Sequence, residues 1–88
     1  MKIPKTLKIQ GHLYKVLLVD TEDLDNDAGE HNLTRNRIKI RKDMPQSQIE
    51  ETLLHEIIHA LNNELSEKDV EFLAQGLYQV LKDNKLLR

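Results

Sequence analysis

Apolar residues in the second half of the chain recur at the three- and four-residue spacing of amphipathic helices. Over residues 48–63 these positions are Ile49, Leu53, Leu54, Ile57, Ile58 and Leu61. Over residues 67–83 they are Val70, Leu73, Leu77, Val80 and Leu81. The pattern predicts one helix over about 48–63 and a second over about 67–83.

Both predicted helices have start signals in the sequence. Ser47 and Glu50 have the spacing of a capping box, in which a hydroxyl and a carboxylate bind the free amides of the first turn. Ser66 and Asp69 mark the start of the second helix in the same way. We therefore expect two separate helices joined by a short turn.

The first half of the chain has the shorter periodicity of strands. Residues 5–10 and 13–19 are β-rich segments that flank Gly11 and His12, which predicts a tight hairpin connection there. Residues 37–41, "RIKIR", alternate cationic and isoleucine side chains, as in a strand with one buried face. A short strand within 28–33 is expected to pair with it through the turn "TRN".

These elements predict an α+β fold with a small antiparallel sheet of two hairpins packed on two helices. Residues 20–27 are polar and rich in turn-forming types, which predicts a loop within the sheet region of about 3–42. A chain of 88 residues can bury one modest core, so residues 1–88 are expected to form a single domain.

Composition narrows the possible partners. The formal net charge is −2, from 13 basic and 15 acidic residues. The chain therefore lacks the excess of basic residues that would indicate a nucleic-acid partner. The chain has no cysteine, so any metal must be held by histidine and carboxylate. No signal-peptide core and no apolar run of membrane-spanning length is present, which predicts a soluble, cytoplasmic protein without a membrane partner.

The candidate chemistry lies in "HEIIH", residues 55–59. Histidines four residues apart on a helix project from one face and can chelate one ion, which predicts His55 and His59 as metal ligands. On a helical wheel they lie opposite the apolar half. With Zn²⁺ bound there, the adjacent Glu56 would act as general base on a metal-activated water.

A third ligand is expected from the second predicted helix, where Glu67 and Glu71 share one edge. Glu71 is preferred because Glu67 is the first helical residue, where a carboxylate already has a role in complementing the helix dipole. Tyr78 lies two turns beyond Glu71 on the same face, and its hydroxyl is a candidate for stabilising an oxyanion.

These residues resemble a known family. "HEIIH" followed by a glutamate in "DVEFLAQ" is similar to the gluzincin class of HExxH zinc metallopeptidases. Over residues 28–84 the order of elements resembles that of small phage and mobile-element proteins of the ImmA/IrrE-like metallopeptidase type.

The resemblance implies a zincin-like core and a hydrolase that cleaves a peptide or protein substrate. It also implies zinc held by His55, His59 and Glu71, with Glu56 as general base. It further implies that the strand "RIKIRK" is the edge strand above the active-site helix, where an extended peptide would pair.

Three alternatives remain open. Asp23, Asp25 and Asp27 repeat the spacing of the first ligands of an EF-hand calcium loop, although Ala28 stands where that loop needs glycine. The chain could instead be a metal-binding adaptor that keeps the peptidase fold without catalysis, or a structural domain that binds through its helical pair. Lone histidines such as His31 are more typical of solvated loops.

Overall fold

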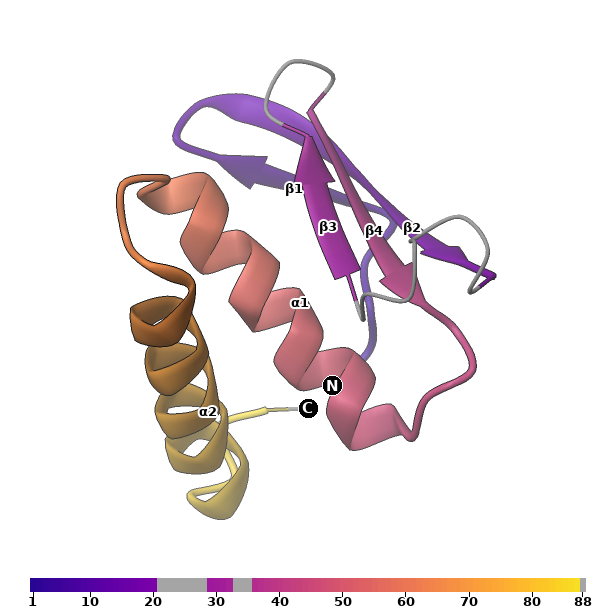
Figure 1. Cartoon of the computed structure of the whole chain (residues 1–88). Coiled ribbons are helices and arrows are strands. Elements are labelled where there is room, and N and C mark those ends of the chain that lie inside the picture. The colour runs from indigo at the N-terminus through magenta and orange to yellow at the C-terminus, as the bar shows by residue number, and fades with distance from the viewer. Residues whose placement is uncertain (21–28, 33–35, 88) are drawn as a thin grey trace.

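The computed structural model describes residues 1–20, 29–32 and 36–87. It contains four strands and two helices in the order β1, β2, β3, β4, α1, α2 (Figure 1). Their bounds are β1 Thr6–Ile9, β2 His12–Val19, β3 Gly29–Asn32, β4 Arg37–Arg41, α1 Gln46–Leu61 and α2 Glu67–Asp83. The α+β class predicted from the sequence is confirmed.

The four strands form a single mixed sheet in the order β1-β2-β4-β3. β1 pairs with β2 and β3 pairs with β4, both antiparallel, whereas β2 and β4 run parallel with Lys15 opposite Arg37. The prediction of a purely antiparallel sheet made of two hairpins is therefore wrong. A connection of some seventeen residues leaves the end of β2 and returns to its start, which permits the parallel alignment.

The order of strands also corrects the predicted edge. β4, which contains "RIKIR", lies inside the sheet between β2 and β3. β3 is the edge strand on that side and contacts α1. β4 can occupy the interior because its Ile38 and Ile40 are fully buried.

The connection between β1 and β2 follows from its two residues. Gln10 and Gly11 have φ of 50° and 84°. Positive φ at both central positions is the geometry of a type I′ turn, whose twist matches that of paired strands. The predicted hairpin is therefore confirmed, although its turn lies at Gln10 and Gly11 and His12 is already the first residue of β2.

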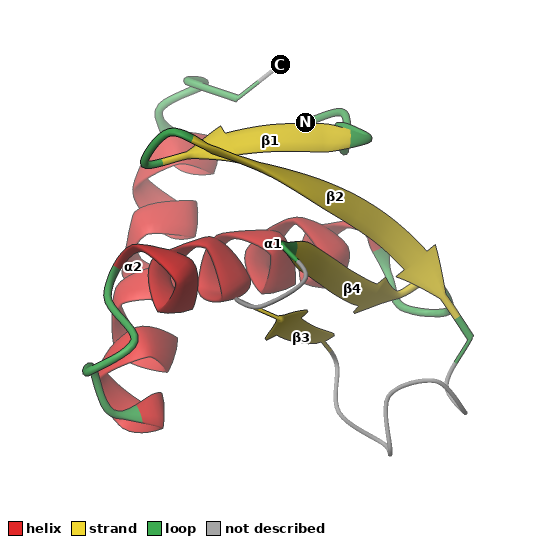
Figure 2. Ribbon diagram, turned by 90° about the horizontal axis from the view of Figure 1, so that it is seen from above, coloured by secondary structure: helices red, strands yellow, loops and turns green. Residues whose placement is uncertain are grey.

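The core lies between the inner face of the sheet and α1. Ile38 and Ile40 from β4 pack there with Ile49 and Leu53 from α1. α2 packs on α1, through Val70 and two further residues of the same face. Both helices thus lie on the same side of the sheet, with α1 as the middle layer (Figures 1 and 2).

The helix starts differ from one another. At α2 the Ser66 hydroxyl accepts a hydrogen bond from the Asp69 amide at 3.1 Å, so the predicted cap is confirmed. At α1 the capping box is wrong, because Pro45 is the N-cap residue and no side chain caps the helix. The Pro45 carbonyl accepts hydrogen bonds from the Gln48 and Ile49 amides at 3.0 and 3.1 Å, so the helix begins two residues before the predicted start and includes Ser47.

Candidate metal centre

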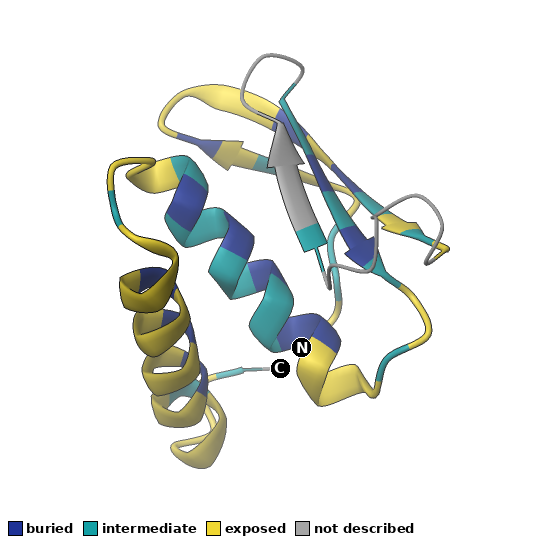
Figure 3. Cartoon of the chain, in the orientation of Figure 1, coloured by how far each residue is buried: buried dark blue, intermediate teal, exposed yellow. Residues whose placement is uncertain are grey.

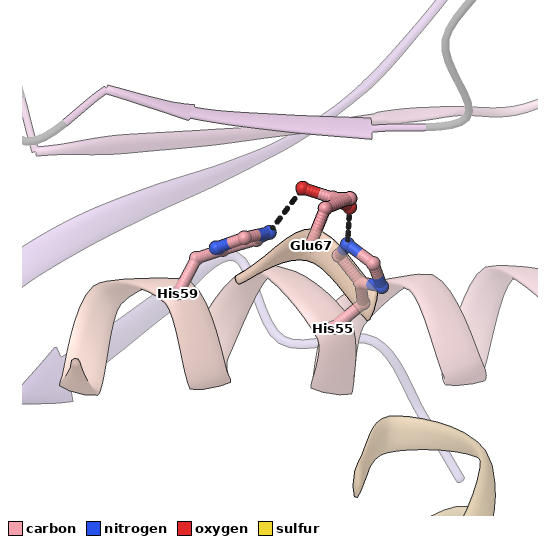
Figure 4. A group of neighbouring side chains, drawn as sticks. All are labelled: His55, His59 and Glu67. Atoms are coloured by element: carbon pink, nitrogen blue, oxygen red, sulfur yellow. Dashed lines mark hydrogen bonds and ion pairs between the residues drawn. The ribbon is translucent and has the colours of Figure 1, made fainter. Parts of the chain in front are cut away.

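Three side chains meet where the end of α1 and the start of α2 lie side by side (Figure 4). His55 Nε2 lies 2.5 Å from Glu67 Oε1, and His59 Nε2 lies 2.9 Å from Glu67 Oε2. Each carboxylate oxygen of one glutamate therefore contacts one imidazole. The two rings are 4.9 Å apart between centroids and meet edge to face.

The arrangement satisfies the first requirement of a metal centre, which is convergence of donor atoms. One donor atom from each of His55, His59 and Glu67 lies within 4.8 Å of the others. His59 is buried, His55 is half-buried, and the Glu67 side chain is 70% exposed. The histidines are thus held by packing, and the group could hold a metal ion that reaches it from the side of Glu67.

Electrostatics keep the Glu67 carboxylate ionised. Desolvation raises its pKa, but hydrogen bonds and positive charge from His55 and His59 outweigh that effect. The pKa of Glu67 therefore lies below its usual value. An ionised carboxylate is the form that binds a metal.

The structure brings Glu67 rather than Glu71 to the histidines, which corrects the preference stated from the sequence. α2 starts at Glu67, directly after the turn that follows α1, so its first residue lies beside the last turns of α1. Glu71 lies one turn further along α2 and is exposed. The short turn between the two predicted helices is the sequence feature that favours Glu67. A carboxylate that complements the helix dipole can also bind a metal.

Tyr78 does not join the metal group. Its hydroxyl donates to Glu50 Oε1 at 2.8 Å, near the start of α1. Eleven residues of helix separate Tyr78 from Glu67, which is about 16 Å at 1.5 Å per residue. Because α2 folds back along α1, this distance carries Tyr78 away from the histidines.

The sequence does not predict the pairing of Tyr78 with Glu50, because the spacing of Ser47 and Glu50 indicates a capping box. Glu50 is buried, at 5% exposure, and also accepts from Gln46 Nε2 at 3.0 Å. Burial raises the pKa of Glu50, but hydrogen bonds from Tyr78 and Gln46 and the charge of the terminal amine lower it by more. Burial and the hydrogen bond to Glu50 raise the pKa of Tyr78.

Glu56, the predicted general base, lies between α1 and the edge strand. It is 4% exposed, and a Cβ built on Gly29 of β3 would lie 3.2 Å from Glu56 Oε2. The same atom would lie 2.6 Å from Thr52 Cγ2. Only glycine therefore lets β3 approach α1 this closely.

The remaining candidate ligands lie elsewhere. His12 is exposed on β2 and is not part of the metal group. The possible calcium ligands Asp23, Asp25 and Asp27, and the side chain of His31, fall outside the described residues. Within the described ranges, neither helix is long and apolar enough to cross a membrane.

Comparisons with protein-family models, with curated proteins and with solved structures give no match. The chemistry of the site therefore has to follow from its own residues and their geometry.

Proposed function

We propose that the chain is a zinc-dependent peptidase. His55, His59 and Glu67 would hold the metal and Glu56 would act as general base. The observation that supports this most directly is that the two histidines of HExxH on α1 converge on a glutamate from the next helix. This is the donor set of a gluzincin, obtained here with Glu67 in place of the expected Glu71.

The donor atoms fit zinc with little movement. Zinc binds nitrogen and oxygen at about 2.0–2.2 Å in a tetrahedron, which separates neighbouring ligand atoms by about 3.4 Å. The two contacts between imidazole and carboxylate are 2.5 and 2.9 Å. Glu67 would have to move outward by less than about 1 Å, which its exposure permits, and the imidazoles would have to turn toward the ion because the donor set spans up to 4.8 Å.

The protein residues would divide the chemistry among themselves. Bound zinc would supply Lewis acidity for water and for the scissile carbonyl. Glu56, next to His55 in the chain, would accept the proton of the attacking water and deliver it to the leaving amine. The one-turn spacing of His55 and His59 would fix the ion against α1.

The edge strand β3 offers a place for an extended substrate. Among the described residues no further strand pairs with the outer edge of β3, and β3 contacts α1, the helix that carries His55 and His59. A peptide that pairs with this edge through main-chain hydrogen bonds would lie along α1. This assigns to β3 the role that the family resemblance implied for "RIKIRK".

The decisive experiment measures zinc per chain and peptide hydrolysis on the same samples. We expect one zinc per chain in the wild type, and the same content but no hydrolysis in Glu56→Gln. His55→Ala should lose both, while Glu71→Gln, a matched change on the exposed side of the next turn, should keep both. Failure of the wild type to bind zinc would refute the proposal.

The burial of Glu56 favours a second candidate, a metal-binding adaptor that does not catalyse. A base that is 4% exposed and lies against β3 has to reach water for every turnover. In an adaptor, the metal would instead fix α2 on α1 and present a surface to a protein partner. One zinc per chain with no hydrolysis of any peptide in a diverse library would select this reading.

A further inference from the structure

Positive and negative side chains lie on different layers of the molecule. β1, β2 and β4 contain five lysines or arginines and no acidic residue, and Glu30 of β3 is the one acidic residue of the four strands. α1 and α2 contain seven acidic residues and two lysines. Because both helices lie on one side of the sheet (Figure 2), the charges of the described strands and helices are separated between the two layers.

Strand register places the five cations on the face of the sheet that points away from α1. Lys15 is opposite Arg37, and both alternate with residues buried against the helix. Leu13, which is 56% exposed, is opposite Lys8 on the same face. We call this surface the basic sheet face, formed by Lys8, Leu13, Lys15, Arg37, Lys39 and Arg41.

One residue of this face has an unsatisfied polar atom. The Nε atom of Arg37 is buried and has no hydrogen-bond partner among the described residues. This atom is closed to solvent, so Arg37 contributes its positive charge to the surface and its Nε is not itself a contact for a partner. Arg41 is ion-paired with Asp43 at 2.9 Å, so the charge offered to an acidic surface comes mainly from Lys8, Lys15 and Arg37.

α2 presents an exposed surface that combines apolar side chains with acidic ones. Phe72 is 77% exposed, and Leu73, Leu77 and Val80 are between 43% and 46% exposed. They lie beside the helix face that packs on α1, so most of α2 is open (Figure 3). We call this surface the acidic helix face, formed by Asp69, Phe72, Leu73, Leu77, Val80 and Asp83.

We propose that the chain self-associates head to tail, with the basic sheet face of one copy on the acidic helix face of the next. The two faces have opposite charge, and each carries exposed apolar side chains that the contact would cover. A symmetric antiparallel pair of α2 helices is disfavoured, because it would place Asp69 of one copy near Asp83 of the other.

A nucleic acid fits the basic sheet face less well than a second copy does. Single-stranded nucleic acid binds by stacking bases on aromatic rings as well as by charge. Tyr14, the aromatic residue of β1, β2 and β4, is buried in the core and cannot provide a platform. The exposed apolar residue Leu13 instead suits the side chains of another protein surface.

The geometry determines how the assembly behaves. A contact between two different faces leaves one unused basic sheet face and one unused acidic helix face at the ends of the assembly. The assembly therefore grows until it closes into a ring or its ends are blocked. Glu67 lies on the side of α2 that contacts α1, so the contact leaves the metal group uncovered. Charge attraction between exposed groups weakens as salt rises.

The test uses two variants of the full chain that each disable one face. Lys8→Glu with Lys15→Glu reverses charge on the sheet, and Leu77→Lys with Asp83→Lys reverses charge on the helix. Lys2→Glu with Lys68→Glu changes the net charge as the sheet variant does, at exposed positions outside both faces. Circular dichroism confirms that each variant is folded, and light scattering after size exclusion gives the mass across a concentration series.

We expect the wild type and the Lys2/Lys68 control to form species larger than monomers that shrink with added salt. Each face variant alone should be monomeric, and an equimolar mixture of the two should form a dimer, because one intact face of each kind remains. A monomeric wild type at all concentrations overturns the proposal. An assembly that survives both variants, or a sheet face that binds an oligonucleotide and not a second copy, also overturns it.

Discussion

Tyr78 and Glu50 form a buried hydrogen bond between α2 and α1, with the phenol donating to the carboxylate at 2.8 Å. Lys82 Nζ, one turn beyond Tyr78, donates in turn to the Tyr78 oxygen at 3.2 Å. The bond lies at the opposite end of the helix pair from the metal group. The two helices are therefore joined by polar contacts at both ends and by apolar contacts between them.

Removing the phenol hydroxyl should weaken the helix pair. Tyr78→Phe deprives a buried carboxylate of a donor, and we expect a loss of about 2 kcal/mol of unfolding free energy, typical of a hydrogen bond to a charged group. Tyr14→Phe is the matched control, because the Tyr14 hydroxyl has no hydrogen bond among the described residues. Equal effects of the two variants on urea unfolding would contradict this account.

Acid should destabilise the metal-free protein through Glu50. The pKa of Glu50 in the folded state lies below its ordinary value of 4.5, so the stability it contributes is fully present above pH 4.5. That stability is lost as the pH falls through the folded pKa. Urea midpoints between pH 6 and pH 3 should fall less steeply in Glu50→Gln than in the wild type, and parallel curves would contradict the assignment.

Gly29 should not tolerate a side chain. Gly29→Ala forces its new methyl to 2.6 Å from Thr52 Cγ2, so we expect a loss of about 1–3 kcal/mol and displacement of Glu56. Gly76→Ala is the control, because a Cβ there meets nothing within 4 Å and alanine favours the helix by about 1 kcal/mol. Thermal unfolding should therefore shift down for the first variant and up for the second.

Zinc should stabilise the folded protein through Glu67. At a free zinc concentration 100 times the dissociation constant, we expect about 2.7 kcal/mol of added stability, measured as a rise in melting temperature that chelator reverses. Glu67→Gln should reduce this rise, whereas Glu71→Gln should leave it unchanged. A rise that depends on Glu71 and not on Glu67 would show that the metal selects a different rotation of α2.

Local features of the fold were predictable from sequence. The bounds of α2 agree with the prediction because the Ser66 cap and the apolar stripe from Val70 are properties of one segment. The hairpin at Gly11 was predictable for the same reason, since a two-residue turn determines its own pairing.

Long-range relationships were not predictable in the same way. The parallel pairing of β2 with β4 depends on where a long connection returns, and alternation of side chains does not encode it. The choice between Glu67 and Glu71 depended on how closely α2 follows α1. Glu50 has the spacing of a capping residue, and only tertiary packing shows that it is buried beside Tyr78.

The three candidate ligands lie within thirteen consecutive residues, from His55 to Glu67, whereas the parallel strands join segments that are far apart in the chain. Contacts between residues close in sequence form faster than those that close long loops. Under the proposed function, the helical hairpin alone would supply all three ligands, without any contribution from the sheet. The proposed base Glu56 differs from these ligands, because it lies against Gly29 of β3 and so depends on the sheet for its surroundings.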